Sequence, residues 1–194
     1  MCQGFGYFFG TGLFWDPDGD DTHLVTHKYA QGGATHYAVG LLVDGAGNDT
    51  WRNDDDDECT GIGYDASVAW HLDLGDGDDT YTMENVSQYT VGVTRFAALG
   101  VLVNEGGDDI YDLAGDPSFS LGRAEEQAGM RAGYLGFDVP AVAMFLDLGG
   151  ADTYPTRGDV GNDRVWIQDE PLGDDWTAGV DFGYGLDGED TWTR

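Results

Sequence analysis

The chain has 194 residues, of which 41% are hydrophobic and 13% aromatic, a globular rather than a disordered composition. Its 8 Lys and Arg stand against 37 Asp and Glu, which gives a formal net charge of −29 at pH 7. Phosphate binding needs clustered cations, so this balance disfavours nucleic acid and anionic membrane surfaces as partners, and no long apolar run marks a membrane span.

One pattern recurs along the chain: an apolar segment, an Asp, a Gly-rich acidic turn, and then Asp-Thr followed by an aromatic residue. Copies of it lie at residues 13–23, 41–51, 70–81, 101–111, 144–154 and, in shortened form, 186–192. The closing aspartates of these copies are 28, 30, 30, 43 and 38 residues apart. The first steps define a basic repeat of about 29 residues, as expected of a solenoid or propeller.

The two longer steps predict insertions at about residues 112–140 and 155–180. The pattern otherwise runs from one end of the sequence to the other. We therefore expect a single repeat domain over residues 1–194, a piece of a longer repeat protein.

Segments of four to eight residues bounded by Gly, Asp and Asn, without a long 3.6-residue period, predict strands. A propeller blade needs four strands and about 40 residues, more than this repeat offers. We therefore expect an all-β fold, a right-handed parallel β-solenoid of about six coils. Like residues of successive coils then stack about 4.8 Å apart.

Two neighbouring columns before the opening Asp of each copy are largely apolar, and strand alternation must send them to opposite faces. We predict that the column adjacent to the Asp points into the core and that the preceding one points outward, where it is covered or forms a contact surface. The predicted inward column is Trp15, Val43, Leu72, Val103, Leu146 and Leu186. The predicted outward column is Phe14, Leu42, His71, Leu102 and Phe145.

Stacking also sets two acidic columns side by side at each turn. The opening column holds Asp16, Asp44, Asp73, Asn104, Asp147 and Asp187; the closing column holds Asp21, Asp49, Asp79, Asp109, Asp152 and Asp190. Unit charges about 4.8 Å apart repel by roughly 1 kcal/mol in water and by several times more at low dielectric constant. Calcium is a hard cation with about six to eight oxygen ligands and relieves that repulsion, so we expect both columns to bind calcium.

The alternative for the same columns needs no metal. An Asp at a turn often accepts hydrogen bonds from backbone N–H groups nearby, and a stacked column of such residues caps the corners. The sequence leaves both interpretations open.

The turns at residues 45–51 and 75–81, GAGNDTW and GDGDDTY, resemble the nonapeptide G-G-x-G-x-D-x-apolar-x of RTX calcium-binding β-rolls. The resemblance covers about seven to nine residues of each coil. It implies calcium held between successive turns by the motif Asp and by glycine-turn carbonyls, which places Asp49 and Asp79 first among the ligands. RTX proteins carry these nonapeptides in tandem, whereas this chain has one in each coil, so the resemblance does not imply the β-roll itself.

Other candidate chemistry is weaker. His23 falls in a column of aromatic residues, so we interpret it as a packing residue rather than a transition-metal ligand. Glu125 and Glu126 offer two carboxylates for glycoside hydrolysis, but adjacent acids alone are weak evidence.

We therefore predict a non-enzymatic, calcium-binding structural or surface module, extracellular or at the cell surface. Its coil ends can stack on further coils of the same protein or on another copy. The alternative is a carbohydrate-active enzyme or glycan-binding module on the same scaffold, with an acidic surface that reflects adaptation to salt.

Overall fold

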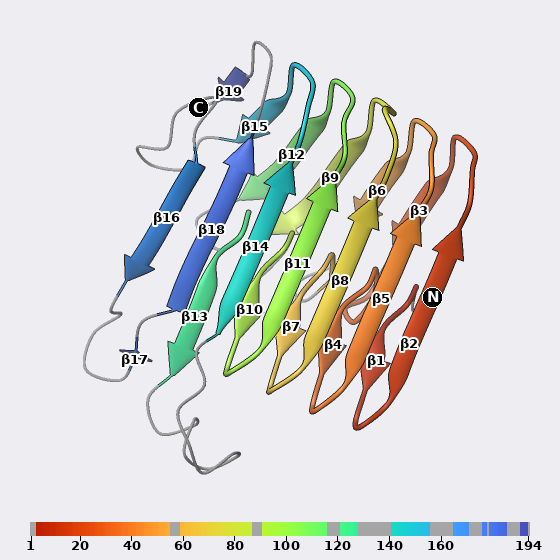
Figure 1. The fold of residues 1–194 in the computed structure, drawn as a ribbon. Helices are drawn as coiled ribbons and strands as arrows, with labels where there is room; N and C mark the ends of the chain where they lie inside the picture. The colour runs from red at the N-terminus through yellow and green to blue at the C-terminus, as the bar shows by residue number, and fades with distance from the viewer. Residues whose placement is uncertain are drawn as a thin grey trace.

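The computed structural model describes residues 3–54, 59–86, 91–115, 121–127, 141–155, 165–170, 176–177, 179–185 and 191–193. These residues form strands joined by turns, and the strands assemble into three sheets (Figure 1). Across the described residues, no helix has the length and hydropathy needed to cross a bilayer.

Each coil contributes one strand to each sheet in turn. Sheet 1 contains β1 (Gly6–Tyr7), β4 (Ala34–Thr35), β7 (Gly63–Tyr64), β10 (Thr94–Arg95), β13 (Ala124–Gln127) and β17 (Trp176–Thr177). Sheet 2 contains β2 (Thr11–Asp16), β5 (Val39–Asp44), β8 (Val68–Asp73), β11 (Leu99–Asn104), β14 (Val142–Asp147), β18 (Gly179–Gly185) and β16 (Val165–Glu170). Sheet 3 contains β3 (Thr22–Val25), β6 (Thr50–Asn53), β9 (Thr80–Val86), β12 (Ile110–Gly115), β15 (Thr153–Pro155) and β19 (Thr191–Thr193).

The sheets are parallel, because each strand pairs with its counterpart in the next coil. The predicted register holds through β2, β5, β8, β11 and β14, where Asp44 pairs with Asp16 and Asp73 and Asn104 pairs with Asp73 and Asp147. Only β16 and β17 are added in antiparallel orientation among the described strands. The chain is thus an all-β, parallel β-solenoid, as the repeat predicted.

The last copy of the repeat departs from the predicted register in sheet 2. Asp147 pairs with Gly185, two residues before the predicted Asp187. Sheet 3 keeps the predicted register, with Tyr154 opposite Trp192. The shift was not visible in the sequence, because the opening and closing Asp of the last copy are two residues closer together than in most other copies. Asp187 and Asp190 themselves lie outside the described residues.

The fifth coil has more residues than the preceding coils, and the additional residues come after β13. Residues before that point keep the spacing of the preceding coil, with Ile110 opposite Thr80 and Glu125 opposite Arg95. Residues 128–140, and much of the second predicted insertion at 155–180, lie outside the described part of the chain. Within that second region the structure describes β16 and β17, which join sheets 2 and 1.

The predicted inward and outward columns of sheet 2 are reversed. Leu42 and Phe145 are fully buried, whereas Trp15 is 67% exposed. Leu42, His71, Leu102 and Phe145 therefore point into the core, and Val43, Leu72, Val103 and Leu146 lie partly exposed on the outer face.

The alternation of inward and outward side chains along these strands was predicted correctly. Because both neighbouring columns are apolar, the sequence pattern did not show which of them faces the core. The residues that identify the inward face lie two positions before each member of the buried column. They are Gly12, Gly40, Ala69, Gly100 and Ala143. This column faces sheet 1, and a Cβ on Gly40 would lie 1.9 Å from the carbonyl oxygen of Gly33. A column restricted to Gly and Ala marks the inward side.

Aromatic rings stacked along the solenoid axis form the centre of the core. From ring to ring the centroids are 4.0, 6.3, 4.8 and 5.2 Å apart, and neighbouring planes are within 19° of parallel. The predicted packing role of this column is confirmed. Its members are His23, Trp51, Tyr81, Tyr111 and Tyr154.

The corner between sheets 1 and 2 uses two consecutive non-glycine residues in the left-handed region. Phe8 and Phe9 have φ of 41° and 59°, and His36 and Tyr37 have φ of 60° and 61°. The same corner recurs in the next two coils. Such backbone costs of the order of 1–3 kcal/mol per residue, so the stacked coils must hold it in place.

Candidate metal centre

The closing column forms a ladder of side-chain to backbone hydrogen bonds. Oδ1 of Asp49 accepts the backbone N–H of Asp21 at 2.7 Å, and Oδ1 of Asp79 accepts that of Asp49 at 2.7 Å. Asp109 and Asp152 continue the ladder at 2.7 and 2.8 Å. One carboxylate oxygen of each residue therefore caps the preceding coil, which is the metal-free role considered for this column. Asp21, in the first described turn, is exposed and the other four are buried.

A second ladder of opposite direction lies on the solvent side of the turns. Oδ1 of Asp20 accepts the N–H of Asn48, Asn48 accepts that of Asp78, Asp78 that of Asp108, and Asp108 that of Ala151, each at 2.9 Å. This ladder was not predicted from the sequence. Its signal is an Asp or Asn directly before the closing Asp in four copies.

The opening column points into the solenoid. Asp73 is 3% exposed, and its Oδ2 accepts hydrogen bonds from Trp51 Nε1–H at 2.7 Å and from the Tyr81 hydroxyl at 2.6 Å. Asp147 is fully buried and its Oδ2 accepts from the Tyr154 hydroxyl at 2.6 Å. The aromatic column thus supplies hydrogen-bond donors to the acids as well as packing.

Asn104 interrupts the opening column with a neutral side chain. Its Nδ2 donates to Oδ2 of Asp109 at 2.8 Å and contacts the Tyr111 hydroxyl at 3.3 Å. The interruption separates two groups of buried acids along the axis.

Each of these groups gathers carboxylates from two successive coils. Cluster I is Asp44, Asp49 and Asp73, and cluster II is Asp109, Asp147 and Asp152; in each, one oxygen per residue lies within 4.8 Å of the others. Oδ2 of Asp44 and Oδ2 of Asp49 are buried and accept no hydrogen bond. Asp79 lies between the clusters, whereas Asp16 is half-buried at the first turn. An all-oxygen set of buried carboxyl groups fits a hard divalent cation.

Burial, reinforced by neighbouring carboxylates, makes these acids hard to ionise. It raises the pKa of Asp44 to about 7 and that of Asp73 to about 6. The pKa of Asp79 rises to about 8 and that of Asp109 to about 10. Without a cation, the interior must take up protons instead.

We expect the cation-free protein to lose stability as pH rises. Asp44, Asp73 and Asp79 have folded-state pKa values above the unfolded value of about 3.9, so their contribution is complete below about pH 4 and is lost as pH rises through 6 to 8. Urea unfolding in chelator at about pH 5 and pH 8 measures this, and the midpoint should be lower at pH 8. Bound calcium should offset that loss, since its ligands must be deprotonated. Equal midpoints at pH 5 and pH 8 in chelator would show that these carboxyl groups ionise as they do in the unfolded chain.

His23 and His36 belong to different parts of the fold. His23 lies in β3, whereas His36 lies at the corner after β4, where its Nδ1 is 2.7 Å from Asp65. Glu125 and Glu126 lie in β13 of sheet 1.

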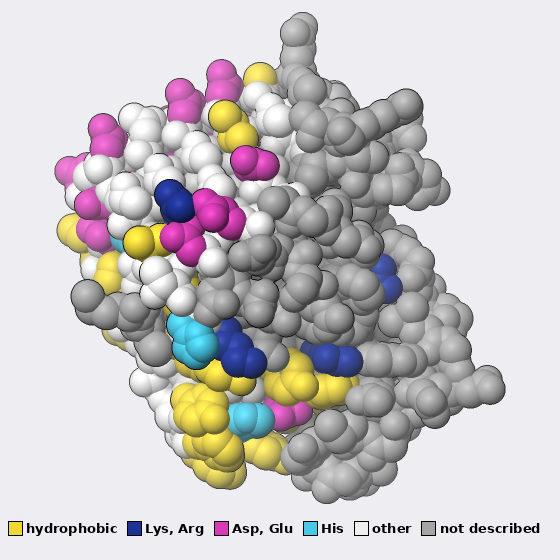
Figure 2. All heavy atoms as spheres, turned by 180° about the vertical axis from the view of Figure 1, so that it is seen from behind, with side chains coloured by type: hydrophobic (Ala, Val, Ile, Leu, Met, Phe, Trp, Pro, Cys, Tyr) yellow, Lys and Arg dark blue, Asp and Glu magenta, His cyan; other side chains and the backbone are white. Residues whose placement is uncertain are grey.

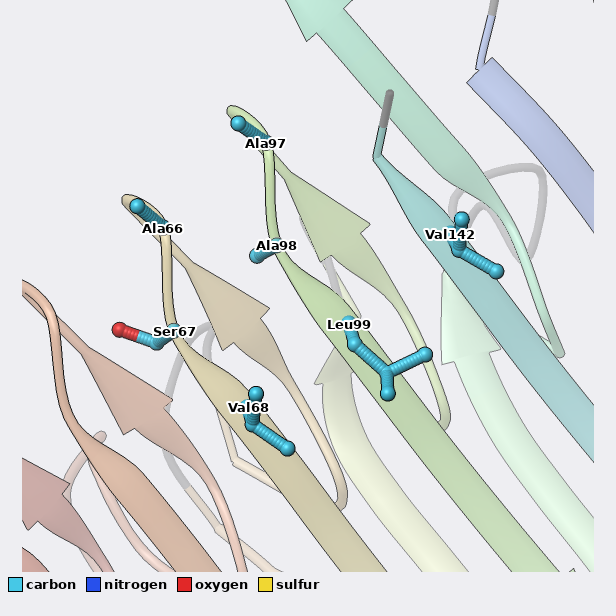
Figure 3. Close-up of a pocket in the computed structure, with 7 residues that line it drawn as sticks. All are labelled: Ala66, Ser67, Val68, Ala97, Ala98, Leu99 and Val142. Atoms are coloured by element: carbon cyan, nitrogen blue, oxygen red, sulfur yellow. The ribbon is translucent and has the colours of Figure 1, made fainter. Parts of the chain in front are cut away.

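A shallow hollow of about 320 Å³ lies at the beginning of β8, β11 and β14 (Figure 3). Its lining is almost entirely apolar, with the Ser67 hydroxyl as its one polar side chain. That hydroxyl is already hydrogen-bonded to the backbone N–H of Ala38 and the carbonyl of Asp65. The hollow therefore lacks an acid, a base and an activated nucleophile. It is lined by Ala66, Ser67, Val68, Ala97, Ala98, Leu99 and Val142.

Comparison with family models, curated proteins and solved structures finds no match to this chain. Burial, distances and charge in the chain itself therefore define the candidate centre. On these grounds clusters I and II are its strongest parts.

Proposed function

We propose that the chain is a non-enzymatic, calcium-binding structural module of a secreted or cell-surface protein. We also propose that the solenoid is right-handed and has about six coils, with insertions in the last two. Calcium would bind inside the turns. The observation that supports this most is in cluster I, where Oδ2 of Asp44 and Oδ2 of Asp49 are buried without a hydrogen bond. Buried anions left in this state are costly unless a cation or a proton joins them.

Calcium suits the clusters better than magnesium. Three carboxylates from two coils supply oxygens without the octahedral order that magnesium demands, and carbonyls of the glycine turns can complete a flexible set of about six to eight ligands. Cluster I would use Asp44, Asp49 and Asp73, and cluster II Asp109, Asp147 and Asp152. Of the two residues that the resemblance to RTX repeats places first among the ligands, this arrangement uses Asp49 but not Asp79.

The test is thermal unfolding at neutral pH in chelator, in calcium and in magnesium. Calcium at about 100 times its dissociation constant should add about 2.7 kcal/mol, and magnesium much less. Asp49→Asn should reduce the calcium-dependent rise in melting temperature, because it removes a cluster charge yet keeps an oxygen for the Asp21 N–H. Asp76→Asn, which changes an exposed acid, is the control. Equal melting temperatures in chelator and calcium would exclude the proposal.

A second candidate is a glycan-binding module, favoured by exposed aromatic residues in the first described coil. Phe8 and Phe9 are 57% and 78% exposed, and the Phe9 ring lies 5.3 Å from that of Tyr37 with planes 8° apart. Figure 2 shows hydrophobic side chains gathered at the lower left of the molecule and acidic ones at its upper left. Aromatic faces of this kind pack well on apolar ligand surfaces such as sugar rings. A glycan-binding screen, with Phe9→Ser as its variant, distinguishes this candidate from a contact with another protein copy.

A further inference from the structure

A third group of potential ligands differs from clusters I and II in containing an imidazole. Ligand atoms of Asp16, His23 and Asp44 lie within 4.8 Å of one another at the first described turn. His23 is 3% exposed, and its Nε2 forms no hydrogen bond although Oδ2 of Asp44 is 3.4 Å away. An unsatisfied buried nitrogen therefore faces an unsatisfied buried carboxylate oxygen.

The ring of His23 is held firmly in this direction. It stacks on Trp51 with centroids 4.0 Å apart and planes 10° from parallel, and Phe14 packs edge-on at 5.7 Å. Gln31 Nε2–H donates to the backbone carbonyl of His23 at 3.0 Å. Little reorganisation is left for a bound ion to impose.

The side chain of Gln3 can set the tautomer. Its amide nitrogen lies 2.8 Å from His23 Nδ1, while its Oε1 has no hydrogen-bond partner. Turning the amide by 180° lets Nδ1–H donate to Oε1 and leaves the Nε2 lone pair directed towards Asp44. Histidines that bind metals usually donate their other ring N–H to such an oxygen.

We propose that Asp16, His23 and Asp44 form a separate site for a divalent transition-metal ion such as Zn²⁺. One imidazole nitrogen and two carboxylates match the borderline preference of zinc, and three protein ligands leave a position for water. Calcium takes oxygen ligands and gains little from the imidazole. Asp16 is only half-buried, which leaves the site open to solvent. Asp44 also belongs to cluster I, but this proposal does not require calcium to bind there.

The test is a titration of the untagged full-length chain with Co²⁺ in the presence of excess calcium. The visible absorption of bound Co²⁺ reports the geometry of its ligands. The wild type should bind about one equivalent tightly, and Zn²⁺ should displace it while added calcium should not. His23→Tyr keeps an aromatic ring in the stack, as in three later coils, and should weaken Co²⁺ binding by a hundredfold or more. Gln3→Ala should weaken it roughly tenfold to a hundredfold.

His36→Tyr removes a histidine that pairs with Asp65 outside the site, and should bind Co²⁺ like the wild type. Circular dichroism and the calcium-dependent melting temperature of His23→Tyr show whether the fold and clusters survive. Wild-type affinity for Co²⁺ in a folded His23→Tyr would overturn the site without touching the calcium proposal. Absence of Co²⁺ binding in the wild type would overturn it as well.

Discussion

Gly107→Ala is expected to destabilise the protein by several kcal/mol, whereas Gly106→Ala at the neighbouring position should be tolerated. A Cβ on Gly107 would lie 1.8 Å from the carbonyl oxygen of Gly77, and its φ of +116° is unfavourable for any L side chain, which alone costs about 1–3 kcal/mol. The atom nearest to a Cβ on Gly106 is 3.4 Å away, on Asp76.

This effect follows from the spacing of the coils rather than from one turn. A Cβ on Gly47, Gly77 or Gly150 would likewise lie 1.7, 1.5 or 1.5 Å from a glycine carbonyl oxygen of the preceding coil. Urea unfolding of both variants in calcium measures the difference. Similar midpoints for Gly106→Ala and Gly107→Ala would mean that the turns do not stack this closely.

Asp73→Ala is expected to have the largest effect among the acidic residues. It leaves the Trp51 indole N–H and the Tyr81 hydroxyl, both buried, without their acceptor. Each orphaned group costs about 1–3 kcal/mol, and the loss of calcium ligation adds to this. Trp51 fluorescence cannot be isolated among 6 Trp, so urea unfolding followed by circular dichroism is the measurement.

Asp73→Asn separates the hydrogen bonds from the charge. The amide oxygen can still accept from Trp51 or Tyr81, as the native Asn104 shows that this column accommodates an amide. In chelator at pH 8, Asp73→Asn should therefore be much more stable than Asp73→Ala, and it should gain less from calcium than the wild type. Equal losses in the two variants would mean that the buried donors do not depend on this carboxyl group.

The repeat predicted the parallel solenoid because Asp, Gly and aromatic residues recur at one spacing, and stacking turns that spacing into neighbours. The predicted phase of sheet 2 was wrong, since Leu42 and Val43 are both apolar and composition does not distinguish inside from outside. The column of Gly and Ala residues that contains Gly40 does show which face points inward. The shifted register at Gly185 arose from a copy of the repeat whose opening and closing Asp are two residues closer together than in most other copies.

The candidate site was predicted only in part. Stacking placed Asp49 above Asp79, but the direction of the carboxylates depends on backbone N–H groups that sequence does not display. In the structure, Oδ1 of Asp49 caps a turn, whereas Oδ2 of the same residue points into cluster I. Turn capping and the proposed cation binding, which the sequence posed as alternatives, would thus use different oxygens of one residue. The proximity of His23 to Asp16 and Asp44 was likewise not visible before the turns were stacked.

Calorimetric titration of the metal-free chain with calcium at neutral pH tests the central claim most directly. We predict saturable binding that is weakened at least tenfold by Asp49→Asn and left unchanged by Asp76→Asn. No heat of binding above that of dilution at millimolar calcium, together with no calcium retained after dialysis, would contradict the claim. The buried carboxyl groups would then be held as acids by protons alone.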